Sequence, residues 1–73
     1  MKTIYSQEHK ILVEKLIRAR EDAGLRQGDV AKLLGKTQSF ISKLESGQRR
    51  IDLVQIKEFA NIYKKPVSFF IYS

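Results

Sequence analysis

Two short helical patterns that meet at a glycine-containing turn occupy the middle of this sequence. Apolar residues at helical spacing predict one helix over residues 27–34 and another over 38–45. Ala31 is small enough for the helices to cross closely, and Gly35 can adopt the left-handed conformation that a tight turn requires. The pattern therefore predicts a helix-turn-helix over about residues 27–45.

Three further helices are expected around this pair, over residues 7–23 and 53–63 and in a last turn that opens at Pro66. The helix over 53–63 has the best marked start, because Asp52 and Gln55 can form a capping box. No segment alternates between apolar and polar residues as a half-buried strand does. The predicted fold class is all-α, a compact unit of five short helices.

The chain has 73 residues and no cysteine. This length suits one small domain, which we expect to span residues 1–73. The lack of cysteine excludes disulfides, iron–sulfur clusters and thiolate zinc sites. No apolar run is long enough for a membrane span, and the first residues lack the pattern of a signal peptide. We expect a cytoplasmic protein without a membrane partner.

The positive charge of the chain is concentrated in its middle third. The net charge is +6, and residues 26–50 alone carry six basic and two acidic side chains, a net charge of +4. The segments before and after each carry +1. A basic excess of this kind attracts polyanions, so the distribution predicts a polyanionic partner that contacts the helix-turn-helix segment.

Catalysis has little support in the sequence. The sole histidine, His9, falls near the start of the first helix, where we expect an exposed surface residue. No carboxylate pair, glycine-rich phosphate loop or His-rich metal spacing is present. We expect a protein that is not an enzyme and that uses no cofactor and no metal.

Taken together, the central residues resemble the Cro and phage-repressor type of helix-turn-helix domain, the XRE family. The resemblance is carried by GLRQ at 24–27, VAKLLG at 30–35 and TQSFISKLESG at 37–47, and extends more loosely over residues 10–71. It implies a five-helix, lambda-repressor-like fold. In that fold the helix at 38–45 enters the major groove of DNA, and the helix before it lies across the backbone.

The resemblance implies that Gln38, Ser39 and Lys43 contact base edges. The chemistry suits this role, because Gln can bond to both N6 and N7 of adenine and Lys can donate to O6 and N7 of guanine. The same residue types are also common on an ordinary solvated helix face, which is the alternative.

A second set of side chains is expected to contact phosphates. Gln27 and Thr37 match phosphate-contacting positions of the family and stand beside the free N–H groups of helix starts. Arg49 and Arg50 follow the 38–45 helix in a loop that the family presents to DNA; the alternative is a solvated charge pair. Lys36 either adds a phosphate contact or points to water. The full set is Gln27, Lys36, Thr37, Ser42, Arg49 and Arg50.

Phe40 lies between the inner and outer faces of the 38–45 helix. It either touches DNA at the rim of the groove or packs against the 27–34 helix, and partial packing is our preferred interpretation.

Arg20 and Glu45 match positions that form an ion pair in some family members. Arg26 and Gly28 depart from the family pattern, which predicts a loose start of the 27–34 helix.

The last residues are too apolar for a loose tail. Some of them must seal the core, but so many large groups can also leave an exposed patch that marks an interface. A twofold dimer would place two DNA-reading helices about one DNA turn apart over a palindromic site. A monomer whose tail only closes the core is the alternative. The interface candidates are Phe69, Phe70, Ile71 and Tyr72.

The function predicted from these features is sequence-specific binding of double-stranded DNA. The protein would be a transcriptional regulator, a repressor or small controller, that binds a palindromic operator as a homodimer. The alternative is an antitoxin or another protein-interaction module whose main role is to bind a protein partner.

Overall fold

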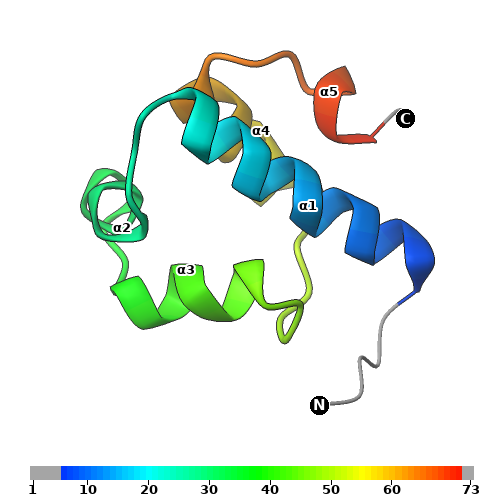
Figure 1. Ribbon diagram of the computed structural model, residues 1–73, viewed down its shortest axis with the longest axis horizontal. Helices are drawn as coiled ribbons and strands as arrows, with labels where there is room; N and C mark the ends of the chain where they lie inside the picture. Colours follow the sequence, from blue (N-terminus) through cyan, green and yellow to red (C-terminus); the bar gives the residue numbers. More distant parts are fainter. Residues whose placement is uncertain (1–5, 72–73) are drawn as a thin grey trace.

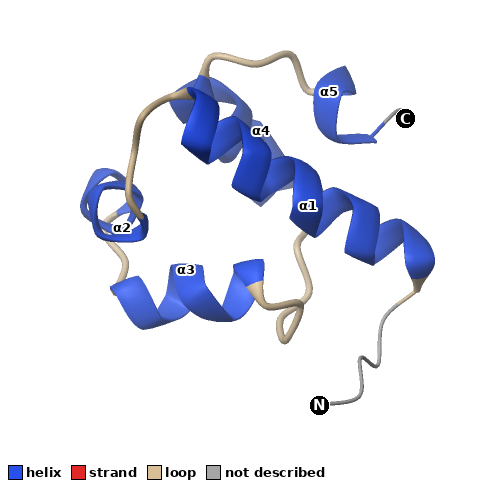
Figure 2. Ribbon diagram, viewed as in Figure 1, coloured by secondary structure: helices blue, strands red, loops and turns tan. Residues whose placement is uncertain are grey.

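The computed structural model describes residues 6–71, and the described part of the chain contains five helices (Figures 1 and 2). They are α1 (Gln7–Asp22), α2 (Gln27–Leu34), α3 (Gln38–Glu45), α4 (Leu53–Tyr63) and α5 (Ser68–Ile71). No strand occurs within residues 6–71. The all-α class is confirmed, and α5 begins two residues after the proline that was expected to open it.

The helices begin where side chains can accept hydrogen bonds from first-turn N–H groups. The Thr37 hydroxyl accepts from the Phe40 N–H at 3.1 Å. At the start of α4, the Asp52 carboxylate accepts from the Gln55 N–H at 2.8 Å, and the Gln55 side chain accepts from the Asp52 N–H at 3.0 Å. The predicted cap at Ser6 also forms. These bonds satisfy donors that the helix itself leaves unpaired, which fixes the helix starts.

The start of α2 lacks the side-chain cap that α1, α3 and α4 have, at the position where Arg26 departs from the family pattern. Arg26 offers no side-chain acceptor to the first turn, but its own N–H donates to the Asp29 carboxylate at 2.9 Å. Of the two reciprocal hydrogen bonds of a capping box, only the one accepted by the Asp29 side chain is therefore present. The other end is well fixed, because Gly35 adopts a left-handed conformation with φ of 68°.

The helix-turn-helix, α2 and α3, forms one side of the molecule, and α1 runs through the centre of the molecule. α2 packs on α3, whereas α1 packs on α3, α4 and α5. In Figure 1, α2 is seen nearly end-on whereas α3 lies lengthwise across the picture, so the two helices cross steeply. This arrangement leaves one long side of α3 without cover from another described helix.

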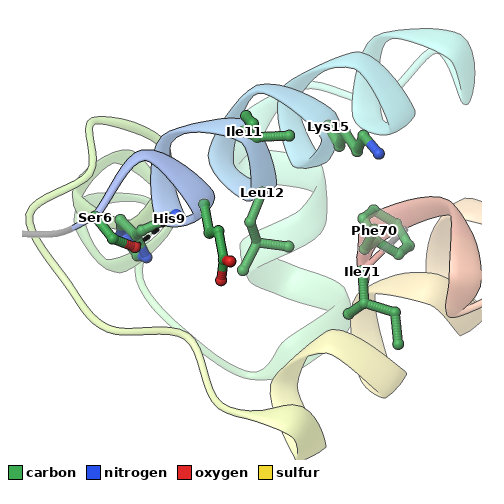
Figure 3. A pocket seen from close by; sticks show the side chains of 8 residues that line it. Ser6, His9, Ile11, Leu12, Lys15, Phe70 and Ile71 are labelled. Carbon is green, nitrogen blue, oxygen red and sulfur yellow. Dashed lines mark hydrogen bonds between the residues drawn. The ribbon is translucent and has the colours of Figure 1, made fainter. Parts of the chain in front are cut away.

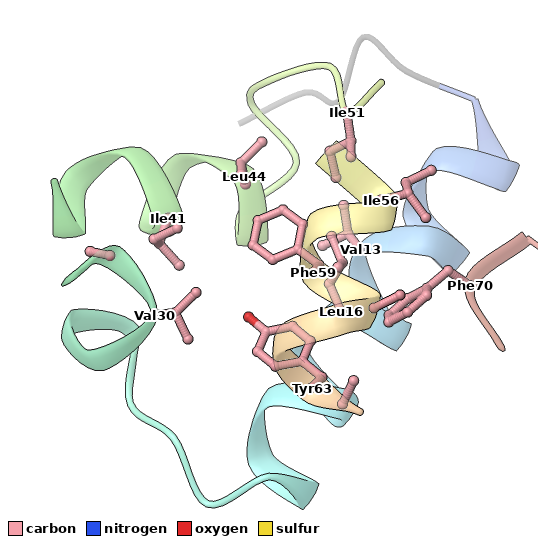
Figure 4. Close-up of a cluster of buried hydrophobic side chains, with 13 residues drawn as sticks. Val13, Leu16, Val30, Ile41, Leu44, Ile51, Ile56, Phe59, Tyr63 and Phe70 are labelled. Atoms are coloured by element: carbon pink, nitrogen blue, oxygen red, sulfur yellow. The ribbon is translucent and has the colours of Figure 1, made fainter. Parts of the chain in front are cut away.

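A single apolar core joins the helices. Its most buried large side chains are Leu16, Val30, Ile41 and Leu44, each with at most 2% of its surface exposed. Figure 4 shows these groups converging with side chains of α4 and α5. None of the helices within residues 6–71 is long and apolar enough to cross a bilayer.

The structure corrects one of the expected interface residues. Phe70 is only 3% exposed and belongs to the core, where its ring packs edge-on against that of Phe69 with centroids 5.2 Å apart. It therefore closes the fold of its own chain and is too buried to form a dimer contact of its own. Phe69 is half-buried and Ile71 is 49% exposed, whereas Tyr72 lies outside the described residues.

Candidate nucleic-acid interface

The side chains of α3 are divided between the core and solvent. Ile41 and Leu44 each have 1% of their surface exposed, because their spacing puts both on the inner side of the helix. The opposite positions are all exposed: Gln38, Ser39, Ser42 and Lys43. All three expected base-contacting residues thus lie on the side of α3 that solvent reaches.

An ion pair connects the C-terminal end of α3 to α1. Arg20 Nε donates to Glu45 Oε2 at 2.8 Å, and Arg20 Nη2 donates to Glu45 Oε1 at 3.1 Å. The Arg20 and Glu45 side chains are 14% and 7% exposed. A third bond runs from Arg20 Nη1 to the Leu25 carbonyl at 2.9 Å. The hydrogen bond to Glu45 raises the pKa of Arg20, and the predicted pair is confirmed as a clamp between α1 and α3.

Gln27 joins this clamp, a contact that the sequence did not reveal. Its Nε2 donates to Glu45 Oε1 at 3.0 Å, so the side chain is held against α3. The carboxylamide nitrogen carries two hydrogens, and Glu45 takes one of them. A phosphate contact by Gln27 therefore has to use the second hydrogen or the backbone N–H.

Thr37 is exposed at the start of α3. Its hydroxyl oxygen accepts from the Phe40 N–H, which leaves the hydroxyl hydrogen to donate outward. The first-turn N–H groups of α3 lie beside it, and such groups attract anions. The site expected to contact a phosphate is thus oriented before any DNA arrives.

Lys36 and Arg49 both lie against the ring of Phe40. The Lys36 ammonium is 5.4 Å from the ring centroid, and the Arg49 guanidinium carbon is 4.7 Å from it. Phe40 is half-buried and packs on the core, in agreement with the preferred interpretation of the sequence. Arg50, the next residue in the sequence, is exposed.

Gly28 borders an open depression between the starts of α2 and α3. The depression is also lined by Arg20, Gln27 and Gln38. A Cβ atom at position 28 would meet only Gln38 Oε1, at 3.7 Å. Gly28, which departs from the family pattern, thus leaves space beside Gln38, one of the expected base-contacting side chains.

A second hollow lies between residues 6–15 and α5 (Figure 3). Leu12, Phe70 and Ile71 form its apolar part, and Ser6, Glu8 and His9 its polar part, around a volume of about 380 Å³. His9 is half-buried here and not fully exposed, which corrects the sequence prediction. The hollow includes Ile71 but is formed by different residues from the exposed side of α3.

The fold and the exposed side of α3 define a small helix-turn-helix domain of the kind that binds DNA. A family model described as helix-turn-helix matches residues 16–70, from the middle of α1 into α5. The chain belongs to this family, the Cro/C1-type or XRE helix-turn-helix proteins. Its members are DNA-binding regulators and not typically enzymes. A comparison with curated proteins finds no match.

Proposed function

We propose that this protein is a sequence-specific, double-stranded-DNA-binding regulator that acts as a repressor or small controller. The observation that carries the proposal is the exposed side of α3, where Gln38, Ser39 and Lys43 lie opposite the buried Ile41 and Leu44. A helix held by its inner side and polar on its outer side suits insertion into the major groove.

The proposed contacts fall into two groups. Gln38 and Lys43 hydrogen-bond to base edges, with Ser39 beside them, and these contacts select the sequence. Phosphates are bound around α3 by Gln27, Lys36, Thr37, Ser42, Arg49 and Arg50, which fix the register but select no sequence. The +4 charge of residues 26–50 supports such binding.

We further propose that two copies bind a palindromic operator. Ile71 is 49% exposed beside the hollow between α1 and α5, and Phe69 is half-buried next to it. A twofold contact through this apolar edge would present two α3 helices to successive major grooves. The protein would act in the cytoplasm, where the chromosome of a bacterium lies.

Selection of bound duplexes from a random DNA pool tests the proposal. We expect enrichment of one motif, with inverted half-sites about 10 base pairs apart, because that spacing brings both grooves to one face of the duplex. An enriched motif without inverted repeats, bound by a monomer in light scattering, would contradict the dimer. A pool without any enriched motif would contradict sequence-specific binding.

The hollow between α1 and α5 also favours a second candidate function, the binding of a protein partner. Its mixed lining of Leu12, Ile71, Glu8 and Lys15 suits an amphipathic segment of another protein. In that case DNA binding would be no tighter than roughly micromolar at physiological salt for any sequence. An antitoxin would have this behaviour if silencing its partner were its main task.

A further inference from the structure

Phe40 joins three consecutive pieces of the chain that the proposed function brings to DNA. Lys36 comes from the turn before α3, Phe40 from its first turn, and Arg49 from the loop after it. Both cations are within 6 Å of the ring centroid, at 5.4 and 4.7 Å, the range in which an aromatic face attracts a cation.

The ring is anchored on one side. Phe40 packs on the core and is half-buried, and its backbone N–H is bonded to the Thr37 hydroxyl. The side chain also has only two torsions, so packing leaves it little freedom. The two cations, by contrast, are exposed, and within residues 6–71 neither forms an ion pair with a carboxylate. The ring is therefore the fixed member of the cluster.

Stacking on the ring leaves both cations able to bind phosphate. A guanidinium over an aromatic ring uses its flat face, while its five N–H donors point outward from the edge. An ammonium likewise keeps donors that turn away from the ring. Long basic side chains normally lose much rotamer freedom when they bind an anion, and a side chain that is already held loses less.

We infer that Phe40 is a positioning residue, which holds Lys36 and Arg49 in place for DNA phosphates beside the groove that α3 enters. The inference rests on the proposed DNA-binding function. It adds that the affinity supplied by Arg49 depends on an aromatic ring at position 40. The ring itself selects no base.

A double-mutant cycle tests this dependence. Fluorescence anisotropy measures the affinity of Phe40→Leu, Arg49→Ala and the double variant for the selected duplex and for a scrambled one. We expect Phe40→Leu to weaken both duplexes alike by about 2- to 10-fold, the cost of ordering a long basic side chain that the ring no longer holds. In the Arg49→Ala background the same substitution should cost clearly less. In an Arg18→Ala background, which loses an exposed charge of α1 instead, it should cost as much as in the parent protein.

Two controls separate positioning from folding. Phe40→Tyr keeps the aromatic face and should retain the parent affinity, and urea unfolding shows whether Phe40→Leu remains folded under the binding conditions. In the free protein, the side-chain protons of Arg49 should show upfield NMR shifts caused by the ring, and these shifts should vanish in Phe40→Leu. This measurement needs no DNA.

The inference is overturned if Phe40→Leu costs the same with and without Arg49, or if the Arg49 shifts do not depend on the ring. A loss confined to one base pair would also overturn it, because Phe40 would then read DNA directly. Equal binding of the parent protein to both duplexes would contradict the proposed sequence specificity, while the cycle measured on either duplex would still test positioning. Absence of binding to both duplexes would contradict the two proposals together.

Discussion

The inner side of α3 is packed against the rest of the protein, whereas its outer side is exposed to solvent. Ile41, Leu44 and Glu45 face inward, and the Glu45 side chain is 7% exposed. Gln38 and Lys43 are exposed on the other side. Substitutions on the inner side should therefore change the free energy of unfolding, whereas substitutions on the outer side should change the free energy of DNA binding.

The largest effect is expected from Glu45→Ala on the inner side. It would leave Arg20 without its carboxylate partner in a site where the Arg20 side chain is 14% exposed, and would also free Gln27. Breaking a buried pair in this way costs roughly 3 to 5 kcal/mol of unfolding free energy. Urea unfolding measures the loss, with Glu14→Ala on the exposed side of α1 as a control. A loss below about 1 kcal/mol would place the pair among weak surface contacts.

A second effect on the free energy of unfolding is expected in the core, at Tyr63 of α4, and only at alkaline pH. Burial raises the pKa of Tyr63 above its ordinary value of 10.0. The unfolded chain therefore loses this proton at lower pH than the folded one, so stability is complete below pH 10 and declines above it. Between pH 10 and the raised pKa of the folded state, the decline attributable to Tyr63 approaches about 1.4 kcal/mol per pH unit. Urea unfolding of Tyr63→Phe should lack this part of the decline. Identical pH profiles would contradict the effect of burial.

Outer substitutions should leave folding nearly unchanged. Gln38→Ala and Lys43→Ala are each expected to lose about 1 to 3 kcal/mol of binding to the selected duplex and to relax specificity at one base pair. Their unfolding free energies should stay within about 0.5 kcal/mol of the parent value. Arg49→Ala, by comparison, should weaken all sequences alike. If Gln38→Ala and Lys43→Ala also weakened all sequences equally, the assignment of base contacts would be wrong.

The smallest effect is expected where an ion pair is open to solvent. Lys65 Nζ lies 3.4 Å from Asp22 Oδ2, and the two side chains are 28% and 50% exposed. Such a pair contributes about 0.2 to 1 kcal/mol, and salt screens it. Asp22→Asn should therefore change urea unfolding slightly at low salt and less at 1 M salt. A loss of unfolding free energy as large as that of Glu45→Ala would show that burial does not determine how much each of the two pairs stabilises the fold.

The sequence predicted the helices well, because their starts and stops depend on nearby residues. Thr37, Asp52 and Gln55 form the expected caps, and Gly35 has the expected positive φ. Each of these features involves residues at most a few positions apart, so spacing and residue type suffice to predict them.

The missed features depend on contacts between distant or irregular parts of the chain. Gln27 bonds to Glu45, 18 positions away, and only the crossing of α2 and α3 brings them together. Arg49 reaches Phe40 through the conformation of a loop without helical periodicity. Phe70 could not be distinguished from Ile71 as core, because a terminal apolar run with no clear period does not show which side faces inward.

The central claim is that the outer side of α3 gives sequence-specific DNA binding. Its most direct test is a salt titration of anisotropy on the selected duplex and on a scrambled duplex of equal length. The account predicts a preference of roughly a thousandfold or more for the selected duplex at physiological salt. Equal affinity for both duplexes, with the same steep salt dependence, would contradict it. Binding would then reflect only the charge of residues 26–50.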